Sequence, residues 1–239
     1  MKNFKLFLAL IGLISFSNHY SQVVCGTPQT GIGQNSFAET NYINSNPICI
    51  NVQFHIVKET NGTGGTSLSQ LDQIMLLLNN HFNPHNIFIK KLGFDIINNS
   101  SFFNMNDSGF NALVAINNIP NAINFYLINN STDWAGRAGD ILSKNLVLMN
   151  SYATTGVASH EVGHCLNLWH TFQGTASGTT GCAELINGSN CNNCGDYICD
   201  TPADANIGVN GGYNPDLTNI MSYSPPPLLT NFSNMQVIE

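Results

Sequence analysis

Charged side chains are scarce in this sequence of 239 residues. They make up only 9% of it, and Arg137 is the only arginine. A nucleic-acid-binding protein needs a basic patch that neutralises phosphates, whereas here seven lysines and arginines face 14 acidic residues. We therefore expect no nucleic-acid partner. Asparagine, serine, threonine and glycine take over the solvation of the surface, which suits an exported protein.

Long apolar runs are also lacking. The run over residues 6–13 is well short of the roughly 20 residues that a membrane-spanning helix needs. It follows Lys2 and Lys5 and precedes small residues, which is the layout of a secretory signal. We expect a cleaved signal peptide at residues 1–21 with an uncertain cleavage site, and hence a secreted protein without a membrane partner. A membrane anchor is the alternative.

No internal repeat or linker divides the roughly 220 residues that follow, which are enough to bury a sizeable core. Residues 48–57 alternate apolar and polar side chains and predict a strand. Apolar residues then recur at helical spacing behind Ser67, which predicts a helix that ends before Pro84. Further strands are expected at residues 87–92, 122–128 and 146–149, and a second helix at about residues 155–166. This order predicts an α+β fold with helices packed on a mixed sheet.

The segment HEVGHCLNLWH at residues 160–170 holds three histidines around one glutamate. His160 and His164 are four residues apart, so on a helix both rings lie on one face and can bind one tetrahedral ion. A catalytic zinc keeps three protein ligands and one open position for water, which makes His170 the candidate third ligand. Glu161 is the candidate general base. By chance this pattern is expected about 10⁻⁴ times per chain, whereas the isolated His55 is interpreted as structural.

His170 can reach the same ion only if the helix ends first. On a continuing helix it would lie about 600° beyond His164, on the wrong side. Asn167 stands where the known signature has glycine. Asparagine is the next residue after glycine to adopt the left-handed conformation that ends a helix. We therefore expect Asn167 to make the helix-ending turn.

With three motifs in order, the sequence resembles the metzincin zinc metalloproteases and, within them, the pappalysin family. The motifs are HEVGHCLNLWHTF, then GDYICDTPAD at residues 195–204, and NIMSY at residues 219–223. The resemblance implies a metzincin-type zincin, with a twisted mixed sheet, an active-site helix and an irregular, disulfide-stapled C-terminal subdomain. It covers most of the chain from residue 48. The sequence ends soon after the methionine motif, where relatives continue into a helix, which leaves truncation of this subdomain open.

The domain organisation that follows has three parts. Residues 1–21 are the signal peptide, and residues 22–47 are a short prosegment or N-terminal extension. Residues 48–239 are a metzincin-like catalytic domain, whose N-terminal subdomain runs to about residue 170 and whose C-terminal subdomain covers residues 171–239.

The resemblance also implies roles for residues beyond the histidine motif. Met221 would be the hydrophobic floor beneath the zinc ligands, although an ordinary core methionine is the alternative. Tyr223 holds the place of a tyrosine that stabilises the oxyanion in astacins and serralysins, with plain packing as the alternative. Pappalysins bind calcium near the second motif, which implies possible oxygen ligands here. These are Asp196, Asp200, Thr201 and Asp204, and a solvated acidic loop is the alternative.

Seven cysteines in an exported chain imply disulfides with one thiol left over. By resemblance, Cys182 and Cys199 form one disulfide, and the partner of Cys191 or Cys194 stays open. The motif Cys-Gly at Cys25 resembles that of pappalysin prosegments, which implies a cysteine switch that occupies the zinc in an inactive precursor. The alternative is a disulfide from Cys25 to Cys49, with Cys165 as the free thiol.

Together these features predict a secreted zinc endopeptidase, with Zn²⁺ and possibly Ca²⁺ as cofactors and a protein or peptide as substrate. Zinc lowers the pKa of its bound water, and Glu161 takes the proton and passes it to the leaving amine. An extended peptide would add to an edge strand, expected near residues 134–138. We expect a monomer. The alternatives are a zinc-bearing adhesion module without turnover and a zinc hydrolase of a non-peptide amide.

Overall fold

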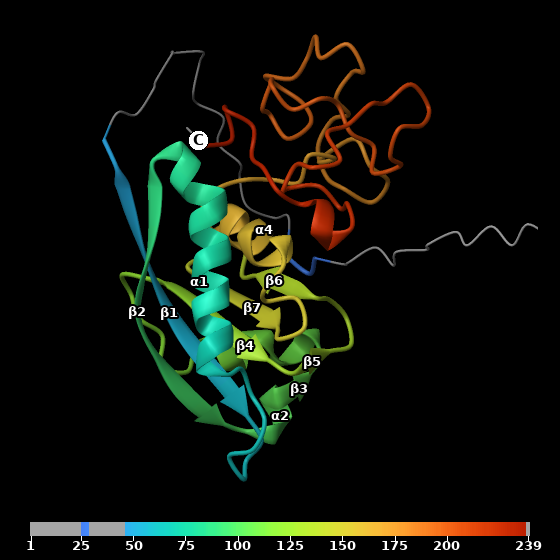
Figure 1. Cartoon of the computed structure of the whole chain (residues 1–239). Coiled ribbons are helices and arrows are strands. Elements are labelled where there is room, and N and C mark those ends of the chain that lie inside the picture. The colour runs from blue at the N-terminus through green and yellow to red at the C-terminus, as the bar shows by residue number, and fades with distance from the viewer. Residues whose placement is uncertain (1–24, 29–45, 238–239) are drawn as a thin grey trace, which may run out of the picture.

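A computed structural model describes residues 25–28 and 46–237. The expected signal peptide and most of residues 22–47 lie outside the described residues. A five-stranded sheet runs through the N-terminal part, with strand order β2-β1-β4-β7-β6 (Figure 1). Its strands are β1 (Ile48–Lys58), β2 (Ile87–Asn98), β4 (Ile123–Ile128), β6 (Gly136–Ala138) and β7 (Asn145–Met149). All pairs are parallel except β6 with β7. The sheet is therefore mixed, as predicted, and β6 is the edge strand expected near residues 134–138.

Helices α1 (Leu68–Phe82) and α4 (Gly156–Cys165) pack on one face of the sheet (Figure 1). A capping box between Ser67 and Gln70 starts α1. The apolar side of α1 is buried against strand residues such as Phe54, in the larger of two hydrophobic cores. Both helices were predicted, with boundaries within one or two residues. This face is the one that carries the histidine motif.

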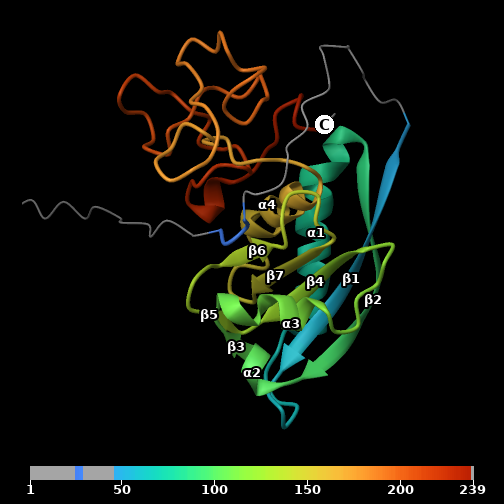
Figure 2. The same cartoon turned by 180° about the vertical axis from the view of Figure 1, so that it is seen from behind.

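The opposite face of the sheet is covered by short elements that the sequence did not reveal (Figure 2). They are α2 (Ser100–Phe103), β3 (Asn104–Met105), α3 (Phe110–Val114) and β5 (Asn130–Ser131), with η2 (Asp107–Gly109) between β3 and α3. Strands β3 and β5 form a small parallel sheet. Elements of two to five residues are too short for a hydrophobic period to develop, so pattern analysis misses them.

Strand β2 is twice as long as predicted. Lys90 and Lys91 interrupt its alternation, which suggested an end near residue 92. In the structure Val52 pairs with Lys91 while Gln53 pairs with Gly93, so Leu92 is one extra residue in a bulge. Beyond the bulge the alternation of side chains between the two faces resumes, shifted by one residue, and the strand continues to Asn98.

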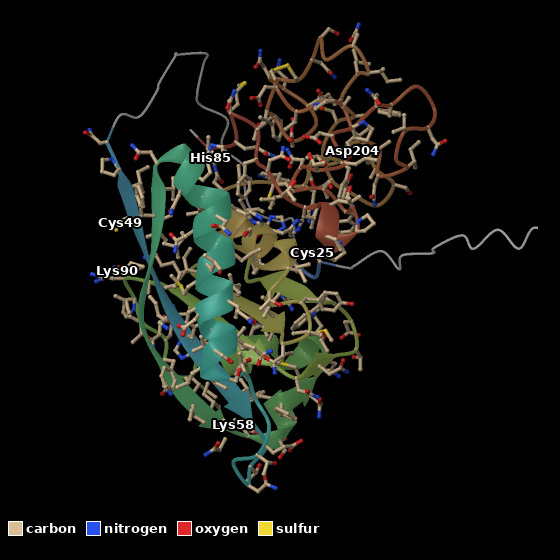
Figure 3. All side chains as sticks on the ribbon, in the orientation of Figure 1. Cys25, Cys49, Lys58, His85, Lys90 and Asp204 are labelled. Carbon is tan, nitrogen blue, oxygen red and sulfur yellow. A yellow bond between two sulfur atoms is a disulfide. The ribbon has the colours of Figure 1, made fainter. Side chains whose placement is uncertain are left out.

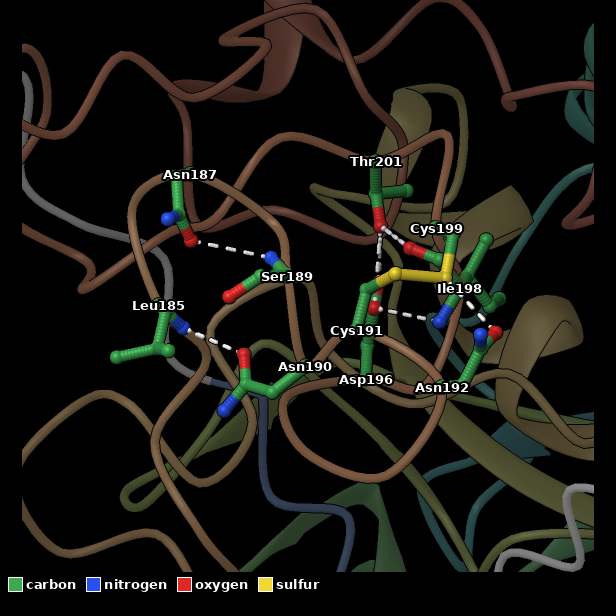
Figure 4. The surroundings of a disulfide bond; sticks show 10 residues. All are labelled: Leu185, Asn187, Ser189, Asn190, Cys191, Asn192, Asp196, Ile198, Cys199 and Thr201. Carbon is green, nitrogen blue, oxygen red and sulfur yellow. Dashed lines mark hydrogen bonds between the residues drawn. A yellow bond between two sulfur atoms is a disulfide. The ribbon is translucent and has the colours of Figure 1, made fainter.

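After His170 the chain is irregular, as expected, and two disulfides hold it. They join Cys182 to Cys194 and Cys191 to Cys199. Figure 4 shows the second of these bonds. The predicted pair of Cys182 with Cys199 is therefore wrong. Gly195 has φ = 73° and its N–H donates to Cys182 O at 3.1 Å, and this turn brings Cys194 beside Cys182.

Two further short helices are η1 (Asn83–His85) and η3 (Pro226–Leu228). Beyond η3 the chain returns to the main body, where Phe232 packs against Phe82 of α1 with ring centroids 5.0 Å apart. No helix among the described residues combines the length and apolar character needed to cross a bilayer.

Candidate active site

Helix α4 ends in a way that returns His170 to its histidine face. Asn167 has φ = 83°, in the left-handed region. Leu168 N donates to Gly163 O at 2.9 Å. Asn167 N donates to His164 O at 3.2 Å, which completes the hydrogen-bond pair of a Schellman helix end. Asn167 therefore lies at the turn that ends α4.

The Nε2 atoms of His160, His164 and His170 face one another at 3.1 to 3.2 Å. His160 Nδ1 donates to Ile220 O at 2.7 Å, and His164 Nδ1 donates to Leu168 O at the same distance. Because Nδ1 carries the proton in these two rings, each Nε2 has a free lone pair. A tetrahedral zinc with Zn–N bonds of about 2.05 Å would space its ligand nitrogens by roughly 3.3 Å. The three side chains therefore fit a zinc ion.

The surroundings keep these rings in the neutral form that binds a metal. None of the three is more than 3% exposed. Burial lowers the pKa of His160 to about 4 and lowers the pKa values of His164 and His170 well below the usual value. Met221 is fully buried beneath α4, where a side chain at Gly163 would collide with its sulfur. The predicted floor residue thus lies directly under the histidine helix.

Glu161 is fully buried beside the histidines. Its Oε2 accepts hydrogen bonds from Ala138 N of β6 and from Thr27 Oγ1, each at 2.9 Å. Burial raises the pKa of Glu161 to about 7, against the opposing effect of these hydrogen bonds. The edge strand passes so close that a Cβ on Gly136 would lie 2.7 Å from Glu161 Oε1, so only glycine fits there. Glu161 is therefore next to both the histidines and the sheet edge.

Tyr223 also lies at the site. Its hydroxyl donates to Cys25 O at 3.1 Å, and its ring packs edge-on against His170 with centroids 4.9 Å apart. The hydroxyl is thus aimed at a peptide carbonyl next to the histidines.

Cys25 reaches the histidine cluster from the N-terminal segment (Figure 3). Its Sγ lies 3.5 Å from His164 Nε2 and 3.6 Å from Glu161 Oε2. The four candidate ligand atoms of Cys25 and the histidines all lie within 4.8 Å of one another. Cys25, Cys49 and Cys165 are free thiols, so the alternative disulfide from Cys25 to Cys49 is not formed. Burial and the nearby carboxylate raise the pKa of Cys25, so a thiolate there calls for a cation among the histidines.

The residues predicted as calcium ligands in the second motif differ in exposure. Asp196, Thr201 and Asp204 are each 3% exposed. Asp200 is instead exposed, and its carboxylate accepts from Ser233 Oγ at 2.6 Å, which ties the loop to the C-terminal segment. Among the described residues, the only tight group of three or more histidine, cysteine or acidic side chains is the one around Cys25. The four predicted calcium ligands therefore do not form one such group.

Sequence reasoning missed Glu184. Only 2% of it is exposed, and its Oε2 has no hydrogen-bond partner among the described residues. Burial, followed by the charge of Asp204, raises the pKa of Glu184 to about 7. Burial also raises the pKa of Asp196. No local motif singles out Glu184, because it lies more than ten residues before the acidic segment.

Comparison with known proteins gives relatives of one kind, although no family model matches the sequence. The chain is 27% identical over 273 residues to an extracellular metalloprotease of Colletotrichum graminicola, covering 96% of this chain and 92% of that protein. It is 27% and 26% identical to extracellular metalloproteases of Neurospora crassa and Sordaria macrospora, over 66% of this chain and 58% of each relative.

Among solved structures, the chain is similar to mature mirolysin of Tannerella forsythia in complex with a cleaved peptide. The TM-score is 0.62 at 19% identity, covering 81% of this chain and 90% of that one. The fold is therefore an α+β fold similar to that of mirolysin, which agrees with the predicted fold class. Fold, relatives and histidine cluster together support a metalloprotease that depends on a bound metal.

Proposed function

We propose that this protein is a secreted zinc endopeptidase of the pappalysin type. The observation that carries the proposal is the convergence of three neutral histidine nitrogens next to the buried Glu161. His160, His164 and His170 would hold the ion. Zinc, when bound, polarises the scissile carbonyl and brings the pKa of a bound water towards neutrality. The extracellular relatives and the N-terminal signal pattern support secretion.

The residues around the ion have complementary parts in hydrolysis. Glu161 takes a proton from the attacking water and gives it to the leaving amine. The Tyr223 hydroxyl donates a hydrogen bond to the scissile carbonyl oxygen as that oxygen becomes negative, just as it donates to Cys25 O in this structure. The extended substrate pairs with β6, whose Gly136 O already accepts from Gly26 N at 2.8 Å.

Cleavage of denatured protein that stops when a chelator is added would support this function. Zinc binding without cleavage would favour an adhesion module, and cleavage of a non-peptide amide alone would favour the third class.

The full-length chain is, in this proposal, a latent precursor in which Cys25 occupies the position of the catalytic water. Its sulfur completes a four-ligand set with the histidines, which suits a tetrahedral ion. Residues 22–47 would then be a removable prosegment and residues 48–239 the catalytic domain, acting as a monomer.

Buried acidic residues of the C-terminal lobe are proposed to bind calcium. Glu184, Asp196 and Asp204 are buried carboxylates, and buried negative charges need a compensating cation. We expect calcium at millimolar concentration to raise the melting temperature of the zinc-loaded protein. The variant Glu184→Gln should lose most of that rise, whereas Glu59→Gln in the loop after β1 should keep it. Equal responses of both variants would contradict the calcium site.

Substrate specificity is proposed to lack a strict preference for arginine or lysine after the scissile bond. Some pappalysins owe that preference to an aspartate shortly after the methionine, and residues 224–228 contain no carboxylate. A small pocket beside Glu161 is lined by Val157, Ser222, Ser224 and Leu229 among others, and Glu161 is the only carboxylate in its described lining. A peptide-library profile should show no dominance of basic residues at that position. Such dominance would refute the proposal.

A further inference from the structure

We propose that Thr27 is a second latch of the precursor, which binds the general base directly, in addition to the thiol on the metal. This inference rests on the proposed function, since it concerns regulation of the same site. Thr27 is 6% exposed and is the described polar residue of the N-terminal segment that reaches Glu161 through its side chain. Nothing in the histidine motif or in the resemblance points to it.

The hydroxyl of Thr27 lies at the centre of a small hydrogen-bond network. Thr27 Oγ1 donates to Glu161 Oε2 at 2.9 Å and accepts from Ala138 N at 2.8 Å. Ala138 N also lies 2.9 Å from Glu161 Oε2, so the amide is shared between the two oxygens. Thr27 therefore bridges the base and the substrate-binding edge strand. A hydrogen bond to a buried carboxylate is among the stronger ones that a neutral side chain can make.

The neighbouring residue sets the register of this contact. Gly26 N donates to Gly136 O at 2.8 Å, and Cys25 pairs with Gly136 in a parallel bridge. A Cβ at Gly26 would collide with the indole of Trp134, which is itself buried. Only glycine therefore lets the segment lie this close to β6. With this register, Cys25 meets the histidines and Thr27 meets the base.

The N-terminal segment is thus attached to the site at two points, the histidines and the general base. The Cys25 thiol lies at the histidines, whereas the Thr27 hydroxyl binds Glu161. The two groups are also linked to each other, since Cys25 Sγ donates to Thr27 Oγ1 at 3.2 Å and accepts from Thr27 N at 3.4 Å. While the hydroxyl occupies Oε2, that oxygen is not available to accept a proton from water. The precursor would thus be held both at the metal and at the base, and opening must break both contacts.

The test measures how fast Cys25 becomes accessible in the zinc-loaded full-length protein. Iodoacetamide is added, and alkylation of the Cys25 peptide is followed by mass spectrometry, which separates it from Cys49 and Cys165. We expect Thr27→Val to speed this alkylation about tenfold, since it removes one hydrogen bond to a charged group. Thr27→Ser should restore the slow rate. Thr63→Val, which removes an exposed hydroxyl in a remote loop, is the matched control and should not change it.

A double-mutant cycle shows whether the effect runs through the base. In a Glu161→Gln background, Thr27→Val should accelerate alkylation much less than in the wild type, because the charged acceptor is already gone. Equal rates for wild type and Thr27→Val, or equal acceleration in both backgrounds at unchanged melting temperature, would overturn the proposal. The readout needs no turnover, so a protein that proves not to be a protease would still test the latch.

Discussion

The variant Glu161→Ala of the processed enzyme is expected to bind one zinc per chain and to lose peptide hydrolysis by about 10³-fold. The metal should remain because the three histidine nitrogens do not depend on the carboxylate, and His160 and His164 are held by Ile220 O and Leu168 O. Activity should fall because Glu161 is the carboxylate next to the histidines that can move the proton. Zinc content by metal analysis and initial rates on a denatured protein substrate measure the two effects.

A matched control for this experiment is Glu59→Ala, which removes a glutamate from the loop after β1. It should leave both zinc content and rate unchanged. Full activity in Glu161→Ala would exclude this residue as the base. Folded wild-type protein that contains no zinc would exclude the proposed metal.

The variant Cys25→Ser of the full-length chain is expected to be active without processing. A latch that leaves about 1% of the precursor open predicts a gain of at most about a hundredfold over the unprocessed wild type, and less while Thr27 still holds Glu161. The reason is that serine lacks the thiolate that competes for the fourth ligand position. The measurement is hydrolysis by freshly secreted protein, with electrophoresis to show that the N-terminal segment is still attached.

Cys49→Ser serves as the control, because Cys49 is also a free thiol but is exposed on β1, away from the site (Figure 3). That variant should stay as silent as the wild type. If the Cys25→Ser protein is inactive until the N-terminal segment is removed, latency depends on contacts other than the thiol. A disulfide at Cys25 in the secreted precursor would rule out the switch.

Local signals were sufficient for the elements with a long hydrophobic period. Helix α1 and strands β1, β4 and β7 lie within two residues of their predicted bounds. Helical spacing marks α1, alternation marks β1, and β4 and β7 are short, mostly apolar runs buried on both faces. The end of α4 was equally predictable, since Asn167 can adopt the left-handed conformation at low cost. Strand β2 is longer than predicted because Leu92 forms a bulge, at which the alternation of apolar and polar side chains shifts by one residue.

The disulfide pairing shows where local reasoning fails. Four cysteines within 18 residues allow three pairings, and the sequence does not rank them. The turn at Gly195 decides that Cys194 meets Cys182, and a resemblance to relatives with another cysteine set led to the wrong partner.

The chemistry of the site can be read from one short segment: two histidines on one helix face, a third after a left-handed turn, and a glutamate between them. These depend on spacing and backbone preference within 11 residues, which are local properties. The surroundings of that chemistry depend on long-range packing. Thr27 meets Glu161 across 134 positions of sequence, and Gly136 lets the edge strand pass beside the same carboxylate. Such contacts follow from how the sheet, α4 and the N-terminal segment pack together, and no period or motif encodes that path.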